Sequence, residues 1–278
     1  MFEFNKAEAY KSLCVYGPPV TGKTEMVVSL LKAGHVVWYI DLDRNTAPFE
    51  AASPEVLKNL RYLRISDNHV TGNIVTCLNA LKVGKLVVCQ DHGVFQCPVC
   101  KKAEPPRPML EFNLGMMGRG DILVLDSFSV VHGSVLRKVI AHNSITPEDM
   151  QRMETTFYAA VANLTAPIWE LFCKPPQPVN TIILTHTKNK APTLIKDPPP
   201  PYYVPNAGSV NFSAESAGRL LGALWYTRVG QPPMYGSSRT ERFDAFTRSV
   251  DPELFKGKSL GEAAVMYFAS TRAAPAPK

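Results

Sequence analysis

A turn framed by two glycines near the N-terminus has the residue types and spacing of a phosphate-binding loop. The pattern G-x4-G-K-T occurs once in the chain and comprises Gly17, Pro18, Pro19, Val20, Thr21, Gly22, Lys23 and Thr24. In such a turn the backbone N–H groups point at phosphate oxygens, the lysine reaches the β- and γ-phosphates, and the last hydroxyl ligates Mg²⁺. We therefore predict that residues 17–24 bind ATP with magnesium; a chance match in a glycine turn is the alternative.

A carboxylate for the same ion follows a later apolar run. Residues 122–125 read as a buried strand, and Asp126 comes directly after them. A carboxylate at the end of a strand beside a phosphate-binding loop can hold the water shell of Mg²⁺. We therefore predict Thr24 and Asp126 as the magnesium site, and an ordinary helix cap is the alternative for Asp126.

Hydrolysis also needs a group that orients or deprotonates water. Asp41 and Asp43 follow the apolar run 36–40, so either can serve as the general base, with simple loop solvation as the alternative. His186 follows the apolar run 181–185. Because ligands of open α/β sheets gather at the C-terminal ends of the strands, a polar residue there faces the γ-phosphate. A structural histidine is the competing interpretation.

Four side chains that suit zinc lie within a short segment: Cys89, His92, Cys97 and Cys100. Tetrahedral zinc takes sulfur and nitrogen ligands, and four protein ligands leave no position for water, so the predicted site is structural. A small insertion at 84–112 has little core of its own, so it needs a stabilising metal site of this kind. A reduced hairpin without metal is one alternative; another makes Cys89 a buried strand residue, with Cys77 or another group as the fourth ligand.

Short apolar runs and helical patterns must position these residues. Strands are predicted at 13–16, 36–40, 60–65, 122–125 and 181–185. Helices are predicted at 23–33, near 70–82, and from Met150 to Ile168, where apolar residues recur every three or four positions. Alternating strands and helices predict an α/β fold with a mainly parallel central sheet flanked by helices.

Composition narrows the class of protein. The chain has 278 residues, enough for one core and one insertion, and its net charge of +6 permits an anionic partner without requiring one. No apolar run is long enough for a membrane span, and residues 1–11 lack the apolar core of a signal peptide. The six cysteines are therefore expected to be reduced thiols, and the protein is expected to be cytoplasmic, without a membrane partner.

The order of these motifs resembles RecA/RadA-type recombinase cores, and especially the minimal RecA-like ATPases of bacteriophages that assist single-strand annealing. The order is the P-loop, then Tyr39-Ile-Asp-Leu-Asp43, Leu123-Val-Leu-Asp-Ser127 and Ile183-Leu-Thr-His-Thr187. The resemblance covers about residues 10–230 and implies a RecA-like P-loop NTPase domain, which we place at 1–250; the predicted zinc hairpin at 84–112 is inserted into it. Residues 251–278 then form a C-terminal extension with a flexible tail, in a protein of the bacterial host cytoplasm if it is phage-encoded.

The resemblance also implies roles for individual residues. The family's catalytic base, a carboxylate two residues beyond the strand's first Asp, falls on Asp43, where these proteins usually carry Glu. The polar sensor falls on His186, where bacterial recombinases have Gln and the phage group typically has His. Lys23, Asp43 and His186 are thus the implied catalytic residues. A trans-acting arginine from a neighbouring subunit can be any one of Arg219, Arg228, Arg239 and Arg242.

Two DNA-facing loops are implied as well, at about 132–145 and 188–213. The first carries Arg137 and Lys138. The second carries lysines that suit phosphates and tyrosines that suit base stacking, and a solvated basic loop is the alternative. Its residues are Lys188, Lys190, Lys196, Tyr202 and Tyr203.

The leading hypothesis is an ATPase that binds single-stranded DNA and supports phage recombination, annealing or repair. It would act as a homo-oligomer or filament, with a single-strand-binding or annealing protein as a partner. The alternatives are a helicase-loader or packaging-type motor that acts through protein partners, a P-loop kinase of small molecules, and a nucleotide-dependent binding module without hydrolysis.

Overall fold

The computed structural model describes residues 10–67, 72–118, 120–143, 154–173, 175, 179–189, 203–205, 223–236 and 252–269. Within these residues a seven-stranded sheet has the order β11-β10-β1-β7-β6-β2-β3. Its pairs are parallel except for β10 with β11 at one edge. The strands are β1 Ser12–Tyr16, β2 Val37–Asp41, β3 Leu60–Arg64, β6 Ile122–Asp126, β7 Asn180–Thr185, β10 Ala223–Arg228 and β11 Gln231–Gly236.

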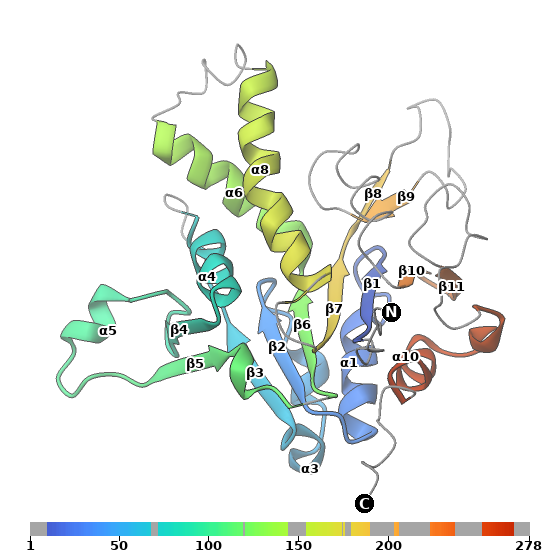
Figure 1. The fold of residues 1–278 in the computed structure, drawn as a ribbon. Helices are drawn as coiled ribbons and strands as arrows, with labels where there is room; N and C mark the ends of the chain where they lie inside the picture. Colours follow the sequence, from blue (N-terminus) through green and yellow to red (C-terminus); the bar gives the residue numbers. More distant parts are fainter. Residues whose placement is uncertain are drawn as a thin grey trace, which may run out of the picture.

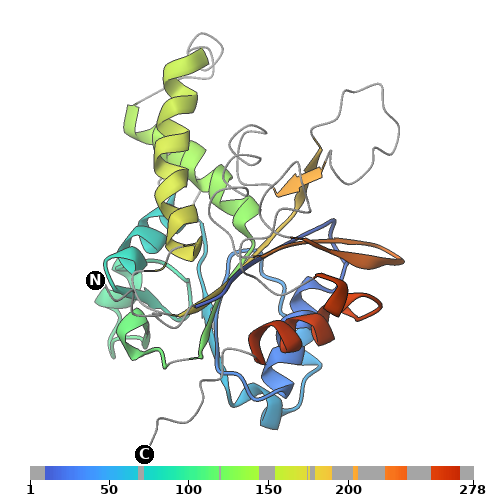
Figure 2. The ribbon, with the colours of Figure 1, turned by 45° about the vertical axis from the view of Figure 1, so that its right-hand side comes forward.

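Helices cover both faces of this sheet (Figures 1 and 2). One face carries α1 (Lys23–Lys32), α2 (Ala47–Glu50), α3 (Pro54–Leu57) and α10 (Leu260–Ala269). The other carries α4 (Asn73–Lys82), α6 (Phe128–Asn143) and α8 (Glu154–Cys173). A mainly parallel sheet between helical layers is the predicted fold class.

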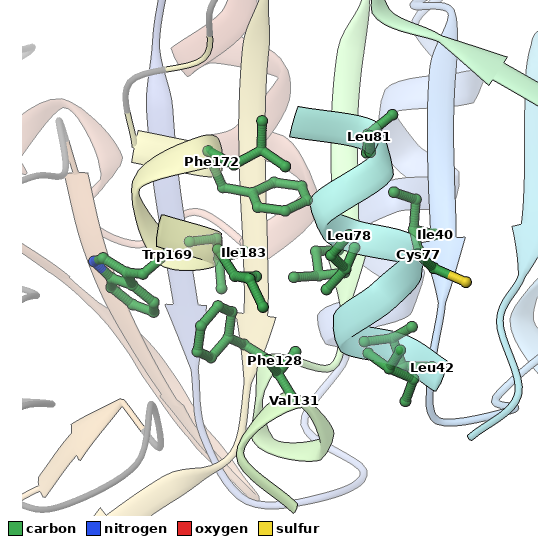
Figure 3. Packing of buried hydrophobic residues seen from close by; sticks show 14 of the residues in the cluster. Ile40, Leu42, Cys77, Leu78, Leu81, Phe128, Val131, Trp169, Phe172 and Ile183 are labelled. Atoms are coloured by element: carbon green, nitrogen blue, oxygen red, sulfur yellow. The ribbon is translucent and has the colours of Figure 1, made fainter. Parts of the chain in front are cut away.

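Side-chain alternation along the strands divides the core into two parts. On β1, Leu13 and Val15 pack under α1 and α10, whereas Cys14 and Tyr16 face the layer of α4, α6 and α8. In the part of the core under α4, α6 and α8, Phe128 of α6 contacts Trp169 of α8 edge-to-face, with ring centroids 4.8 Å apart. Figure 3 shows Phe172, Leu78 and Ile183 in the same packed layer. The strands β1, β2, β6 and β7 are buried along their whole length on both sides, which is why they read as nearly continuous apolar runs.

The insertion between β3 and β6 forms a separate antiparallel pair. It consists of β4 (Lys85–Cys89) and β5 (Met109–Asn113), with the short helix α5 (Pro98–Lys102) between them and the 3-10 turn η1 (Leu114–Met116) after them. Figure 1 shows this hairpin beside α4 and away from the central strands. Leu86, Val88 and Phe112 join the core under α4, so the base of the hairpin is packed and only its tip extends outward.

Residues near the C-terminus also enter the core. The 3-10 turn η3 (Pro252–Phe255) and α10 contribute Phe255, Ala264 and Phe268, all buried with α1. Gly261 allows the close contact between α10 and α1, because a Cβ there would lie 2.3 Å from Ser29 Oγ. The described part of the C-terminal extension is therefore integral to the main domain. The predicted tail at 273–278 lies outside the described residues.

The predicted strands and the helices at 23–33 and 70–82 are confirmed within a few residues at their ends. The long helix is confirmed as α8 from Glu154, and Met150 and Met153 lie outside the described residues. The predicted loop at 132–145 is wrong for residues 132–143, which continue α6 as a helix. Among the described residues, no helix combines the length and apolarity needed to cross a membrane.

Candidate nucleotide and metal sites

The phosphate-binding loop connects β1 to the N-terminus of α1. Gly17 lies so close to β10 that a side chain does not fit. A Cβ at this position would come within 2.4 Å of the Thr227 carbonyl oxygen. Gly22, with φ of 79°, immediately precedes α1 in the left-handed conformation that glycine adopts without steric cost. Thr227 Oγ1 donates to the Thr21 carbonyl at 3.1 Å and ties the loop to the neighbouring strand. Packing thus holds the backbone of the predicted phosphate-binding loop in place between β1, β10 and α1.

Lys23 lies folded across this loop and is only 8% exposed. Its Nζ donates to the carbonyls of Gly17 at 3.0 Å and Pro18 at 2.6 Å, and to Thr21 Oγ1 at 3.3 Å. Burial lowers the pKa of Lys23, and the carboxylates of Asp126 and Asp43 oppose that shift. These neutral carbonyl partners can be exchanged for phosphate oxygens, which would pair fully with the ammonium charge.

Thr24 and Asp126 meet as a magnesium site requires. Thr24 Oγ1 donates to Asp126 Oδ2 at 3.2 Å, and Asn45 Nδ2 donates to Thr24 Oγ1 at 3.3 Å. Tyr39 OH donates to the same carboxylate oxygen of Asp126. Burial raises the pKa of Asp126. Hard oxygen donors beside a phosphate-binding loop fit Mg²⁺, so Thr24 and Asp126 can hold this ion together with phosphate oxygens.

Asp43 and His186 come together although they follow different strands. The strand order places β7 between β1 and β6, so His186, which follows β7, emerges between the P-loop and Asp126. Asp43 follows β2 on the far side of β6. Its Oδ2 lies 3.5 Å from His186 Nε2, and this interaction is the main cause that lowers the pKa of Asp43. The backbone N–H of His186 donates to Ser129 Oγ at 2.8 Å, which fixes the chain at this point.

Asp41 has a different role from Asp43. It is fully buried, and its Oδ1 accepts hydrogen bonds from the backbone N–H groups of Asp43 at 3.0 Å and Arg44 at 2.7 Å. Its Oδ2 accepts a hydrogen bond from Tyr62 OH. A carboxylate committed on both oxygens cannot easily take a proton from water. Of the two aspartates, Asp43 is the one that faces the site.

The tip of the hairpin gathers the four predicted zinc ligands. The ligand atoms of Cys89, His92, Cys97 and Cys100 all lie within 4.8 Å of one another. His92 Nδ1 is 3.2 Å from Cys100 Sγ, 3.6 Å from Cys97 Sγ and 3.7 Å from Cys89 Sγ. Zinc–ligand bonds of about 2.0–2.3 Å in a tetrahedron separate the ligand atoms by about 3.3–3.8 Å. The three separations from His92 match those of a closed tetrahedral site, and the four ligand atoms converge on one point that an ion can occupy.

Other properties of the hairpin agree with a metal site. A hydrogen bond from the backbone of Cys100 is the main cause that lowers the pKa of Cys97 to about 7, which favours its thiolate, whereas burial raises the pKa of Cys100 to about 12. Cys77 lies outside this group and instead contacts Asn73 Oδ1 at 3.7 Å. Three cysteines and Val94 are the only apolar cluster found at the tip among the described residues.

The residues predicted to bind DNA are not gathered into one surface by the described part of the chain. On α6, Arg137 forms an ion pair with Asp67 and donates to it from Nε at 2.9 Å, and Lys138 Nζ donates to Thr76 Oγ1 at 3.2 Å. Only the backbone is described for Lys188, in β8 (Thr187–Asn189), and for Tyr203, in β9 (Tyr203–Pro205). Lys190, Lys196 and Tyr202 lie outside the described residues.

Of the four arginines predicted as candidates to act in trans, the structure describes Arg228 alone. The other three, Arg219, Arg239 and Arg242, lie outside the described residues. Arg228 ends β10 with its guanidinium over the Tyr226 ring, 5.9 Å from the centroid.

Sequence reasoning missed several residues of the site. Tyr39 and Tyr62 occur in apolar strand patterns, where they read as core residues, and Asn45 reads as a loop residue. A buried tyrosine needs a partner for its hydroxyl, and this is the one signal that could have linked Tyr39 to a nearby carboxylate.

No known protein family has a profile that matches this chain, and no curated protein matches its sequence. Among solved structures, the chain is similar to one titled "Crystal structure of the RadB recombinase". The similarity covers 82% of this chain and 81% of that chain, with 14% sequence identity and a TM-score of 0.38. A structural similarity this low supports no statement about activity. Any statement about activity rests on the chemistry of the site.

Proposed function

We propose that this protein is a RecA-like ATPase that hydrolyses ATP with Mg²⁺, binds single-stranded DNA and supports recombination, annealing or repair in a bacteriophage. One observation carries the catalytic part of this proposal. Lys23, the Thr24–Asp126 pair and the Asp43–His186 pair lie together at the C-terminal edge of one parallel sheet. This set supplies a phosphate-binding ammonium, a magnesium site and a carboxylate beside an imidazole, which together are the groups that triphosphate hydrolysis needs.

Each residue has a distinct task in the proposed reaction. Lys23 exchanges its contacts with the Gly17 and Pro18 carbonyls for β- and γ-phosphate oxygens. Asp43 accepts the proton of the attacking water, and His186 contacts the γ-phosphate through Nε2. Bound Mg²⁺ supplies neutralisation of the charge that develops on the phosphate oxygens. Because His186 Nε2 faces Asp43 in the structure, arrival of the γ-phosphate draws the imidazole away and frees the carboxylate for water.

The DNA part of the proposal is supported by chain continuity. β8 begins at Thr187, one residue after His186, and pairs with β9 in an antiparallel ladder. Lys188 lies in β8, Tyr203 begins β9, and Lys190, Lys196 and Tyr202 fall between these two strands in the sequence. A shift of His186 toward the γ-phosphate would therefore act directly on the base of the DNA-binding segment. Assembly into a homo-oligomer, with an arginine of one subunit reaching the nucleotide of the next, belongs to the same proposal.

We also propose that Cys89, His92, Cys97 and Cys100 hold a structural zinc ion. The ligand chemistry, the distances between ligand atoms and the small apolar cluster at the tip support this assignment. The ion would supply folding energy to the hairpin and take no part in hydrolysis.

Turnover of ATP with and without single-stranded DNA tests the catalytic and DNA parts together. The variant Lys23→Ala is expected to lose at least about a hundredfold in turnover, the scale of removing one charge-stabilising group. Lys32→Ala is the matched control, because Lys32 is an exposed lysine at the other end of the same helix, and it is expected to retain activity. Single-stranded DNA is expected to stimulate the wild type, and its affinity is expected to fall with rising salt.

Two results would contradict the proposal. Lys23→Ala with the turnover of Lys32→Ala would remove the P-loop from catalysis. Turnover that is indifferent to DNA, with phosphate transferred to a small acceptor, would replace the proposal with the kinase hypothesis.

A further inference from the structure

Two tyrosines on neighbouring strands each hold one carboxylate of the nucleotide edge. Tyr39 of β2 donates its hydroxyl hydrogen to Asp126 Oδ2, and Tyr62 of β3 donates to Asp41 Oδ2. The two strands pair in parallel with Tyr39 opposite Tyr62, and the rings stack with centroids 6.1 Å apart and an interplanar angle of 12°. The two tyrosine side chains therefore lie side by side on the same face of the sheet, and their hydroxyls donate to different carboxylates, Asp126 and Asp41.

Packing fixes the position of the Tyr39 hydroxyl. The side chain is fully buried, and Phe49 contacts the ring edge-to-face with centroids 4.8 Å apart. A ring held between Phe49 and Tyr62 has little freedom to rotate, so its hydroxyl lies at a fixed point beneath Asp126. The carboxylate is thereby anchored from inside the core.

The anchoring bond selects one oxygen of Asp126. Oδ2 accepts hydrogen bonds from both Tyr39 OH and Thr24 Oγ1, and no described residue donates to Oδ1. With Oδ2 held from two sides, the plane of the carboxylate is set, and Oδ1 is left for a water molecule of the ion's shell.

The partner tyrosine acts on the general base by a different route. Tyr62 fixes Asp41 Oδ2, and Asp41 Oδ1 accepts the backbone N–H groups of Asp43 and Arg44. Arg44 has φ of 60°, so the turn that presents Asp43 is held in a conformation that a non-glycine residue rarely adopts. The two hydrogen bonds to Asp41 Oδ1 hold the backbone of this turn at the residue that carries the base and at the one after it.

We propose that Tyr39 is a positioning residue for the magnesium site and that Tyr62 is a positioning residue for the general base. This assignment rests on the proposed ATPase function. Tyr39 sets the orientation of Asp126 and thus the affinity for the ion. Tyr62 sets the turn that carries Asp43 and thus the rate of the chemical step. The two tyrosines stack on each other, but their effects on the reaction are separable.

Tyr39→Phe and Tyr62→Phe form a matched pair that tests this separation, because each removes one hydroxyl and keeps the stacked ring. For Tyr39→Phe, the Mg²⁺ concentration that half-saturates ATP binding is expected to rise about tenfold, the scale of one hydrogen bond to a charged group. Affinity for nucleotide without the ion is expected to stay unchanged. The spectrum of bound Mn²⁺ by electron paramagnetic resonance is expected to change in this variant and not in Tyr62→Phe.

For Tyr62→Phe, kcat is expected to fall about tenfold with KM and the Mg²⁺ requirement unchanged, since the hydrogen bond that is lost orients the base alone. Thermal unfolding of both variants, followed by circular dichroism, checks that each remains folded at the assay temperature.

The outcomes separate this assignment from the function on which it rests. A wild type without Mg²⁺-dependent nucleotide affinity overturns the proposed function and the tyrosine assignment with it. A wild type that has this affinity, with a Tyr39→Phe variant of unchanged Mg²⁺ requirement, overturns the tyrosine assignment alone. Equal rises in Mg²⁺ requirement in both variants overturn it too, because they would reflect a loosened aromatic cluster.

Discussion

The nucleotide edge of the sheet and the tip of the cysteine hairpin keep their shape in different ways. At the edge of the sheet proposed to bind nucleotide, Lys23 and Thr24 at the start of α1 and Asp126 at the end of β6 are all buried against the packed core. At the tip, the apolar cluster consists of three cysteines and Val94, while Val99 between the last two cysteines is 63% exposed. One site is preorganised by the core, whereas the tip has little core of its own, and there the proposed zinc ion would supply the stability that a core supplies elsewhere.

A buried asparagine connects the two regions. Asn73, at the start of α4, donates from Nδ2 to the Ser66 carbonyl at 2.6 Å and the Gly93 carbonyl at 3.1 Å, and its Oδ1 accepts the Phe95 N–H at 3.2 Å. Ser66 lies two residues after β3, and Gly93 and Phe95 belong to the hairpin. The segment between the ligands His92 and Cys97 is therefore fastened to the end of β3 and the start of α4 by hydrogen bonds that do not require the metal.

The largest effect is expected from removing two metal ligands. In Cys97→Ser/Cys100→Ser, zinc content should fall from about one ion per chain to none. Amide exchange in α5 should accelerate by several orders of magnitude, because the tip loses its main source of stability, whereas exchange in β4 and β5, which pack under α4, should change little. Nucleotide affinity should stay within about threefold of the wild type, since distant sites act additively. Elemental analysis, hydrogen exchange and equilibrium binding provide the measurements.

Cys77→Ala is the control for this prediction, since Cys77 is a buried cysteine outside the cluster. It should retain zinc. Metal retained by the double variant, or lost from Cys77→Ala, would show that the ligands are assigned incorrectly.

A smaller effect is expected at the link between the two regions. Asn73→Ala removes the hydrogen bonds to the Ser66 carbonyl and the Phe95 N–H and one of the two to the Gly93 carbonyl, which should lower the free energy of unfolding by about 2–3 kcal/mol. Asn79→Ala, on the same helix and half-buried, should cost less than about 1 kcal/mol. Urea denaturation of both variants measures the difference. Equal costs would mean that the hairpin is fastened by its apolar contacts under α4 and not by Asn73.

Behind the nucleotide site, Gly261→Ala tests the close contact between α10 and α1. Alanine in a helix is normally favoured over glycine by about 1 kcal/mol. Here the added Cβ meets Ser29 Oγ at 2.3 Å, so a net destabilisation of about 1–2 kcal/mol is expected. Pairing it with Ser29→Gly in a double-mutant cycle should recover the loss. A stabilised Gly261→Ala variant would show that α10 is not tightly docked, and zinc content should be unchanged throughout.

The smallest effect concerns the Asp43–His186 pair and its dependence on pH. The hydrogen bond from His186 lowers the pKa of Asp43 below its ordinary 3.8. A lowered carboxyl pKa stabilises the folded state above the unfolded value, and this contribution is lost as the pH falls through the folded value. At about pH 6, Asp43→Asn should therefore be less stable than the wild type by about 0.5 kcal/mol or less, since the pair is partly exposed.

This difference should shrink as the pH falls below about 4. In a His186→Asn background the Asp43 substitution should lose most of its effect. Urea unfolding across this pH range provides the measurement, and a difference that grows toward acid pH would contradict the assignment of the pair.

The parts of the fold that were predictable have a local cause. The P-loop was predictable from the spacing of its glycines, lysine and threonine, and α1 follows it directly. The strands were predictable from short segments rich in apolar residues, and several of these end at glycine or aspartate. These segments are 13–16, 36–40, 60–65, 122–125 and 181–185. The weaker predictions concern longer range. Residues 132–143 carry few of the signals that separate a helix from a basic loop, and the family resemblance favoured the loop. The docking of α10 on α1 was not predictable, because it depends on a contact between Gly261 and Ser29, which are far apart in the sequence.

The sequence by itself determined the chemistry that each short segment can offer. It identified a lysine and a hydroxyl in a glycine turn, a carboxylate after a strand, and four zinc-preferring side chains within a short span, because these signals depend on residue type and spacing alone. Only the tertiary structure decided which groups meet. The strand order set His186 between the P-loop and Asp126 and brought it to Asp43, and parallel pairing of β2 with β3 put Tyr39 and Tyr62 side by side beneath their carboxylates. Strand order and register depend on contacts between residues distant in the chain, and those contacts leave no local pattern.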